Sequence, residues 1–94
     1  MNSVGPNKKA ALTAIRRFPH FELPIRRLIE ADENFREICE ELAEAEIALG
    51  TVTSMPASLR EARQAEWQDL VDRLAGEVEA AIRSDASGRG IRMT

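Results

Sequence analysis

The chain has 94 residues, of which 44% are hydrophobic and only 4% aromatic, and its formal net charge at pH 7 is −3. This length allows one domain, and a domain this small buries a smaller fraction of its surface than a larger one, so partners or self-association are expected to supply part of its stability. No stretch approaches the roughly 20 apolar residues that a membrane span needs, no secretory signal is expected because no apolar run follows the first basic residues, and the single cysteine favours a reducing cytoplasm.

The first predicted helix covers about residues 8–18, after a start at residues 1–6 that is expected to be disordered. Asn7 is an acceptable N-cap, and Pro19 ends the helix because proline cannot continue it. A helix of this length is marginal alone and has to dock on another element. Its apolar face consists of four residues at helical spacing: Ala11, Leu12, Ile15 and Phe18.

An irregular corner is predicted from Phe18 to Pro24, because each proline removes a backbone donor and biases the preceding residue away from helix. Pro24 can begin a short second helix, at about residues 24–31, since proline is tolerated in the first turn.

The third predicted helix covers about residues 33–49. Asp32 has the right chemistry for its N-cap, and Gly50 is its expected left-handed stop. Four glutamates, interpreted as a solvated face, fall on the outer sides of this helix: Glu37, Glu40, Glu41 and Glu44. Its apolar stripe follows intervals of three and four: Phe35, Ile38, Cys39, Leu42, Ala45 and Leu49.

The fourth predicted helix covers about residues 58–84 and is capped by either Ser54 or Ser58. Gly76 costs about 1 kcal/mol relative to alanine, which is tolerable if a neighbour packs there. Residues 85–94 are expected to form a flexible tail. One continuous apolar face is predicted along this helix: Leu59, Ala62, Trp67, Leu70, Val71, Leu74, Val78, Ala81 and Ile82.

The short connection between the last two helices makes them antiparallel neighbours. The fold class is therefore all-α: a helical hairpin with a short N-terminal helix, in a single domain over residues 7–84. Pairing residues equidistant from the turn places Cys39, shielded, beside Trp67. Apolar stripes this wide need a third element, supplied either in cis by the N-terminal helix or in trans by a second hairpin in a four-helix homodimer. The homodimer is the preferred expectation.

No catalytic, cofactor-binding or metal-binding residue is predicted, and no small-molecule substrate. A cysteine nucleophile needs a base beside it, but His20 is the only histidine and Cys39 lies on the apolar stripe. The glutamates lack the Glu-x-x-His motif that accompanies paired metals in helical bundles, and no glycine-rich phosphate loop is present.

The basic residues are concentrated at the start of the chain. Up to Arg27 there are six basic residues and one acidic residue, a net charge of +5, whereas the remainder carries −8. Such a chain can pair its basic end with its own acidic helix, with a neighbour's, or with an outside polyanion. The first two uses are preferred, and binding to nucleic acid or an anionic membrane surface is the alternative. The candidate interaction residues at this end are Lys8, Lys9, Arg16, Arg17, Arg26 and Arg27.

Ile47 is a seventh candidate. It lies about 140° round the helix from Leu42, so it either widens the buried face together with Ala43 or marks a second contact.

The layout is similar to that of small, uncharacterised bacterial proteins of the YdcH-like kind, helical hairpins in which an arginine-rich lead-in precedes a Phe-centred helix. The similarity lies in residues 26–30, 35–41 and 67–82, about two thirds of the chain being covered. The extra segment before Phe21 and the proline-containing turn depart from that layout. The resemblance implies the fold alone. The sequence therefore predicts a non-enzymatic helical protein–protein interaction or oligomerisation module, either a homodimer or a binder of another helical protein.

Overall fold

The computed structural model describes the backbone of residues 6–92 and the side chains of residues 8–86. The disorder expected at the start of the chain concerns residues 1–5, which lie outside the described residues. Every element of the described part is helical, which confirms the all-α class. In chain order the elements are α1 (Pro6–Arg17), the 3₁₀ turn η1 (Pro19–Phe21), α2 (Glu22–Ala31), α3 (Glu33–Gly50), the 3₁₀ turn η2 (Val52–Ser54) and α4 (Ala57–Arg92).

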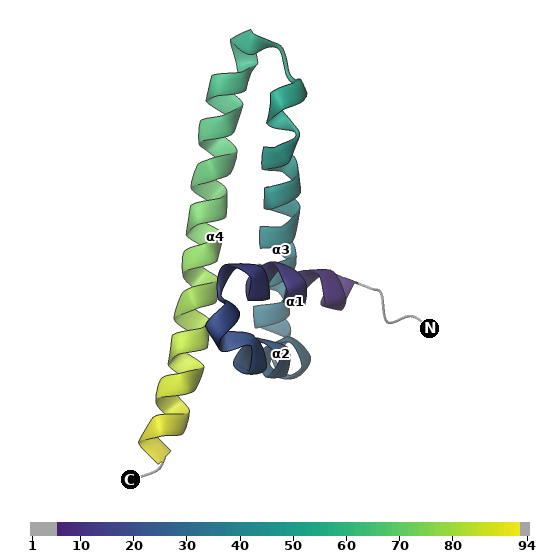
Figure 1. Ribbon diagram of the computed structural model, residues 1–94. Coiled ribbons are helices and arrows are strands. Elements are labelled where there is room, and N and C mark those ends of the chain that lie inside the picture. Colours follow the sequence, from purple (N-terminus) through teal and green to yellow (C-terminus); the bar gives the residue numbers. More distant parts are fainter. Residues whose placement is uncertain (1–5, 93–94) are drawn as a thin grey trace.

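Helices α3 and α4 lie side by side and run antiparallel along the long axis of a molecule that measures 57 × 34 × 20 Å (Figure 1). Helix α1 crosses over α3, and α2 packs against α1, α3 and α4 near one end of the molecule (Figure 1). The N-terminal helix therefore docks in cis, on its own chain. None of the described helices has the length and apolar character needed to cross a membrane.

The α3–α4 pair has two unlike halves. We call residues 48–70 the arm, which contains the end of α3, η2 and the start of α4, and we call the rest of the described chain the base. Helices α1 and α2 cover the pair in the base, and neither reaches the arm (Figure 1). Every residue from 57 to 66 is exposed. The buried residues of α4 all lie in the base: Val71, Leu74, Val78 and Ile82.

The core lies in the base, where side chains of all four helices form one buried cluster. Alanines on α1 allow its backbone to approach α3 closely, while larger side chains fill the space between the other helices. Trp67 packs against the edge of this cluster. The largest fully buried side chains of the cluster are Phe35, Ile25, Leu42, Ile82, Val71 and Val78.

The junction between α2 and α3 is fixed by two side chains. The carboxylate of Asp32 accepts a hydrogen bond from the backbone N–H of Phe35 at 3.2 Å, which confirms Asp32 as the N-cap of α3. The Nη1 of Arg36 donates to the Ile29 carbonyl at 3.0 Å, and this bond satisfies an acceptor that the end of α2 leaves without a helical donor.

The first two helices begin earlier than the sequence predicts. α1 begins at Pro6, so Asn7 is a helical residue and not the cap; proline is well suited to a first position, where its missing N–H costs nothing. α2 begins at Glu22, and η1 occupies the predicted irregular corner, so Pro24 lies within the first turn of α2. Pro19 does end α1, at Arg17.

Neither serine caps α4. The helix begins at Ala57, and the carbonyl of Pro56 accepts its first hydrogen bonds, so Pro56 holds the N-cap position. Ser58 lies inside the first turn. Ser54 belongs to η2 instead, where its hydroxyl donates to the Thr51 carbonyl at 3.1 Å. The proline presets the backbone for the start of the helix, and this replaces a side-chain cap.

The predicted ends of the two long helices are also wrong. Gly50 is the last residue of α3 but is not left-handed, since no described glycine has a positive φ; Thr51 follows with a helical backbone and leads directly into η2. Helix α4 continues to Arg92 instead of ending at residue 84. Asp85, just beyond the predicted end, is held by an ion pair with Arg27 at 3.2 Å, and no proline follows to interrupt the helix.

Candidate protein-interaction surface

Helix α1 packs through its small residues. Ala10, Ala11, Thr13 and Ala14 are buried, whereas Leu12 is 42% exposed. The predicted apolar face, which included Leu12, is therefore wrong in part. Small side chains let α1 lie closer to α3 than a leucine would, and close packing over a long contact is favoured because dispersion falls steeply with distance.

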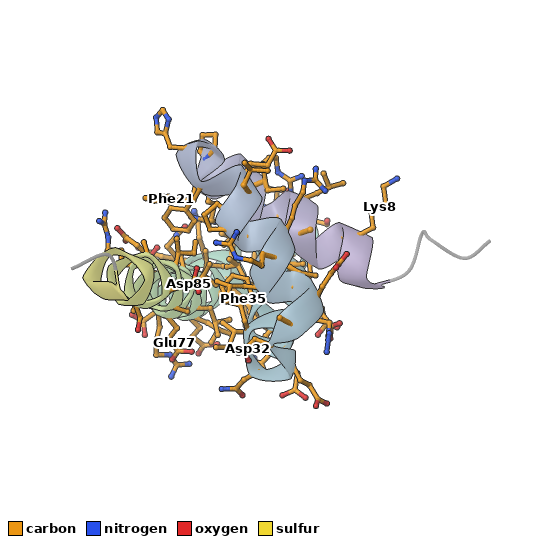
Figure 2. All side chains as sticks on the ribbon, turned by 90° about the horizontal axis from the view of Figure 1, so that it is seen from below. Lys8, Phe21, Asp32, Phe35, Glu77 and Asp85 are labelled. Atoms are coloured by element: carbon orange, nitrogen blue, oxygen red, sulfur yellow. The ribbon has the colours of Figure 1, made fainter. Side chains whose placement is uncertain are left out.

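The opposite side of α1 faces solvent and is basic. Residues three and four positions apart share one side of a helix, and Figure 2 shows Lys8 pointing away from the body of the molecule near the start of α1. We call this surface the α1 basic face. Its residues, all exposed, are Lys8, Lys9, Leu12 and Arg16.

Ion pairs within the chain engage the four candidate arginines. The carboxylate of Glu46 on α3 forms ion pairs with Arg17 at 2.6 Å and with Arg16 at 3.8 Å. These pairs hold the end of α1 against α3. Farther along, Arg27 pairs with Asp85, between α2 and α4, and Arg26 pairs with Glu22 within α2 at 3.0 Å. The chain thus uses part of its charge asymmetry internally.

Lys8 and Lys9 differ from those arginines. Within residues 8–86, neither lysine has an ion-pair partner. Two of the six basic candidates therefore carry charges that no described side chain neutralises.

The outer side of α3 carries the opposite charge. Glu40, Glu44 and Ile47 lie at positions i, i+4 and i+7 and so share one side of the helix; we call them the α3 acidic face. Neither glutamate forms an ion pair within the described side chains. Ile47 is 53% exposed, whereas Ala43 is buried. Ile47 therefore does not widen the buried face together with Ala43, and its role as a second contact stays a prediction.

The two faces adjoin at a hollow of about 390 Å³ where α1 crosses α3. Its lining combines apolar groups with two cations and one carboxylate. We call this place the α1–α3 corner. The residues that line it are Lys9, Thr13 and Arg16 from α1 and Ala43, Glu46 and Ile47 from α3.

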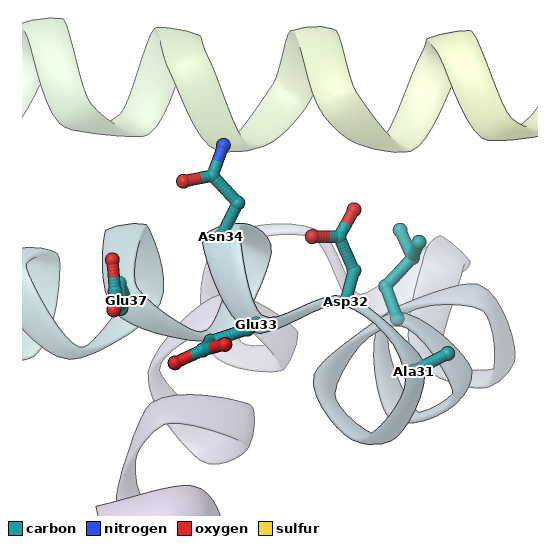
Figure 3. Close-up of a pocket in the computed structure, with 6 residues that line it drawn as sticks. Ala31, Asp32, Glu33, Asn34 and Glu37 are labelled. Carbon is teal, nitrogen blue, oxygen red and sulfur yellow. The ribbon is translucent and has the colours of Figure 1, made fainter.

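A larger hollow, of about 690 Å³, lies at the α2–α3 junction and is drawn in Figure 3. Asp32 and Asn34 point toward α4 in this view, whereas Glu33 points away from it. One oxygen of Asp32 is already engaged as the helix cap. Among the described residues, no group of three or more His, Cys, Asp and Glu side chains is placed to hold a metal ion. This hollow has an acidic rim, to which Asp32, Glu33 and Glu37 contribute.

Cys39 is fully buried in the core, as the sequence predicts. Burial, together with a smaller contribution from the nearby charge of Glu40, raises the pKa of its thiol to about 12. A thiol with this pKa is protonated at neutral pH and is a poor nucleophile. His20 is exposed in η1.

No protein-family model, no curated protein and no solved structure matches this chain. Its function is therefore inferred from its surfaces. Sequence reasoning identified the lysines and Ile47 as candidates. It placed Leu12 in the core, and it did not note that Glu40, Glu44 and Ile47 share one side of α3. The alanines at positions 10, 11 and 14 were the available signal, because they form a second stripe on α1 that competes with Leu12 for the packed side.

Proposed function

We propose that this protein is a non-enzymatic helical interaction or oligomerisation module that binds a helical partner at the α1–α3 corner. The observation that carries the proposal is the exposure of two large aliphatic side chains, Leu12 at 42% and Ile47 at 53%, on the two helices that meet there. In this proposal α3 and α4 act as a hairpin that presents the surface, and α1 completes it.

The corner has the composition of an interaction surface. Specific interfaces have an apolar centre and a polar rim, and here Leu12 and Ile47 are accompanied by lysines on α1 and glutamates on α3. Burying an aliphatic side chain that is now half exposed contributes about 1 kcal/mol. The rim charges then select the partner and orient it more than they add affinity.

The corner is also held in place before binding. The ion pairs of Glu46 with Arg16 and Arg17 and the close packing of α1 on α3 keep the two helices in one arrangement. A surface that is already ordered loses less conformational entropy on association.

Binding to a polyanion, either nucleic acid or an anionic membrane, is the second proposal. Its support is the pair of lysines on α1 that lack partners within the described side chains, next to the exposed Leu12. It ranks second because the other four basic candidates already form ion pairs within the chain.

The proposed function is tested by site-specific photo-crosslinking. A benzophenone amino acid at position 47 of the full-length chain should give protein adducts in native cells, because this position lies at the corner. The same probe at position 65 is the control, since Ala65 is exposed on the part of α4 that belongs to the arm. Leu12→Glu should abolish the adducts from position 47. Equal labelling from both positions, or adducts that survive Leu12→Glu, would show that the corner is not the binding surface.

A further inference from the structure

We propose that the partner is a second copy of this chain, docked reciprocally so that the α1 basic face of each copy lies against the α3 acidic face of the other. This inference rests on the proposed function and names its partner and geometry. It follows from the placement of charges that have no ion-pair partner among the side chains of residues 8–86.

Four charged residues around the corner have no ion-pair partner within the described side chains: Lys8 and Lys9 on α1, and Glu40 and Glu44 on α3. The crossing of α1 over α3 places the two signs next to each other. A two-fold axis through such a surface brings the positive half of each copy onto the negative half of the other, so every cross-chain contact is made twice. The corner is self-complementary in this sense.

The two exposed aliphatic residues are also placed to meet across the proposed two-fold axis. Leu12 belongs to the basic face and Ile47 to the acidic face, and both are about half exposed. The operation that places the lysines of one copy against the glutamates of its partner also brings Leu12 toward Ile47. The result is an aliphatic contact at the centre of a ring of opposite charges, which is the usual anatomy of a protein interface.

The other exposed aliphatic residues lack this complement. Leu23 is the most exposed, at 74%, but its neighbours Glu22 and Arg26 already neutralise each other. Leu59, at 48%, lies in the arm, where residues 57–66 are all exposed. Single exposed aliphatic residues of this kind are ordinary on protein surfaces.

An anionic polymer or membrane would use only half of the corner. It would attract Lys8 and Lys9 but would be repelled by Glu40 and Glu44. The second copy is the occupant that uses both charge signs, and this difference separates the two readings experimentally.

The test is a charge exchange between two full-length variants. One carries Lys8→Glu and Lys9→Glu, and the other carries Glu40→Lys and Glu44→Lys. Each variant alone places like charges at all the cross-chain contacts, so its self-association, measured by sedimentation equilibrium, should weaken about a hundredfold relative to the unmodified chain. An equimolar mixture should recover dimers, because the exchanged charges are complementary at both halves of the interface. The unmodified dimer should weaken with added salt.

Thermal unfolding followed by circular dichroism checks that both variants are folded, which is expected because Lys8, Lys9 and Glu44 are exposed and Glu40 is only partly buried. The inference is overturned if the unmodified chain is monomeric at high micromolar concentration, or if either variant dimerises as well as the unmodified chain. It is also overturned if the lysine variant loses binding to DNA or anionic vesicles while the glutamate variant gains it and neither changes self-association. Position-47 adducts with a different protein, from a chain that is monomeric, would sink the second-copy inference alone and leave the proposed function standing.

Discussion

The base and the arm are built from the same two helices, yet they are packed very differently. In the base, α4 buries Val71, Leu74, Val78 and Ile82 completely or nearly so, whereas in the arm no residue from 57 to 66 is buried. The third and fourth helices of the base, α1 and α2, account for the contrast (Figure 1). Two helices have one shared inner side, and a compact core forms only where another layer covers the pair.

The sequence of α4 shows the same division. At helical spacing, the positions that precede Val71 on the same side of α4 are Trp67, Gln64 and Arg60. Trp67 is partly buried, and the other two are exposed. The stripe therefore becomes polar within the arm, and the continuous apolar face predicted to begin at Leu59 is wrong. Arg60 donates from Nη2 to the Met55 carbonyl at 3.1 Å, a bond that secures the turn and adds nothing to an apolar core.

The largest effect should come from equivalent truncations in the two halves. Ile82→Ala removes a fully buried side chain from the base and should lower the free energy of unfolding by about 2–5 kcal/mol. Leu59→Ala removes a side chain that is 48% exposed in the arm, and it should cost less than about 1 kcal/mol. Urea unfolding of both variants measures the difference. Equal losses would mean that the arm is packed as tightly as the base.

A second, smaller effect depends on pH and reports on the base alone. The pKa of the Cys39 thiol is raised to about 12 in the folded chain, against an ordinary value of 9.0. Below pH 9 the thiol is protonated in both the folded and the unfolded chain and has no effect on stability. Above pH 9 only the unfolded chain loses this proton, so the free energy of unfolding should fall by about 1.4 kcal/mol per pH unit.

The control for this pH effect is Cys39→Ala, measured by urea unfolding between pH 9 and 10.5 alongside the unmodified chain. The variant loses the thiol but keeps every other titrating group, so the difference between the two slopes isolates Cys39. Parallel slopes would show that the thiol reaches water without unfolding, and the base would then be looser than its burial indicates.

The sequence is most informative about features set by local pattern. The all-helical class, the Asp32 cap and the burial of Cys39 follow from spacing and from side-chain chemistry within a few residues. The side of α1 that packs against α3 does not follow from local pattern. The alanine stripe and the Leu12–Ile15 stripe both have helical spacing, and only the shape of α3 decides which of them is buried. Hydrophobicity favours the leucine, and close approach favours the alanines.

The candidate surface also depends on which side of α1 packs against α3. Once the alanines pack, Leu12 turns outward among the basic residues, and this is what places an aliphatic side chain on the α1 basic face. The individual residues Lys8, Lys9 and Ile47 could be singled out from the sequence, but the meeting of Lys9 with Ile47 at one corner depends on where α1 crosses α3. A crossing point is a tertiary property that no periodicity in either helix contains.

The smallest predicted effect compares two helical glycines, Gly76 in α4 and Gly50 at the end of α3. At both Gly76 and Gly50 an added Cβ would meet nothing within 4 Å, so alanine fits at either place, and no neighbour packs closely at Gly76 to offset the cost of the glycine. Gly76 lies well inside α4, where Gly76→Ala should raise the free energy of unfolding by about 1 kcal/mol, or roughly 4–8 °C in Tm. Gly50 is the last residue of α3 and borders the arm's turn, where fewer helical hydrogen bonds depend on its conformation, so Gly50→Ala should raise stability by less than half as much. Thermal unfolding of the two variants measures this ratio, and a larger gain at Gly50 would mean that the helix end in the arm limits the stability of the whole chain.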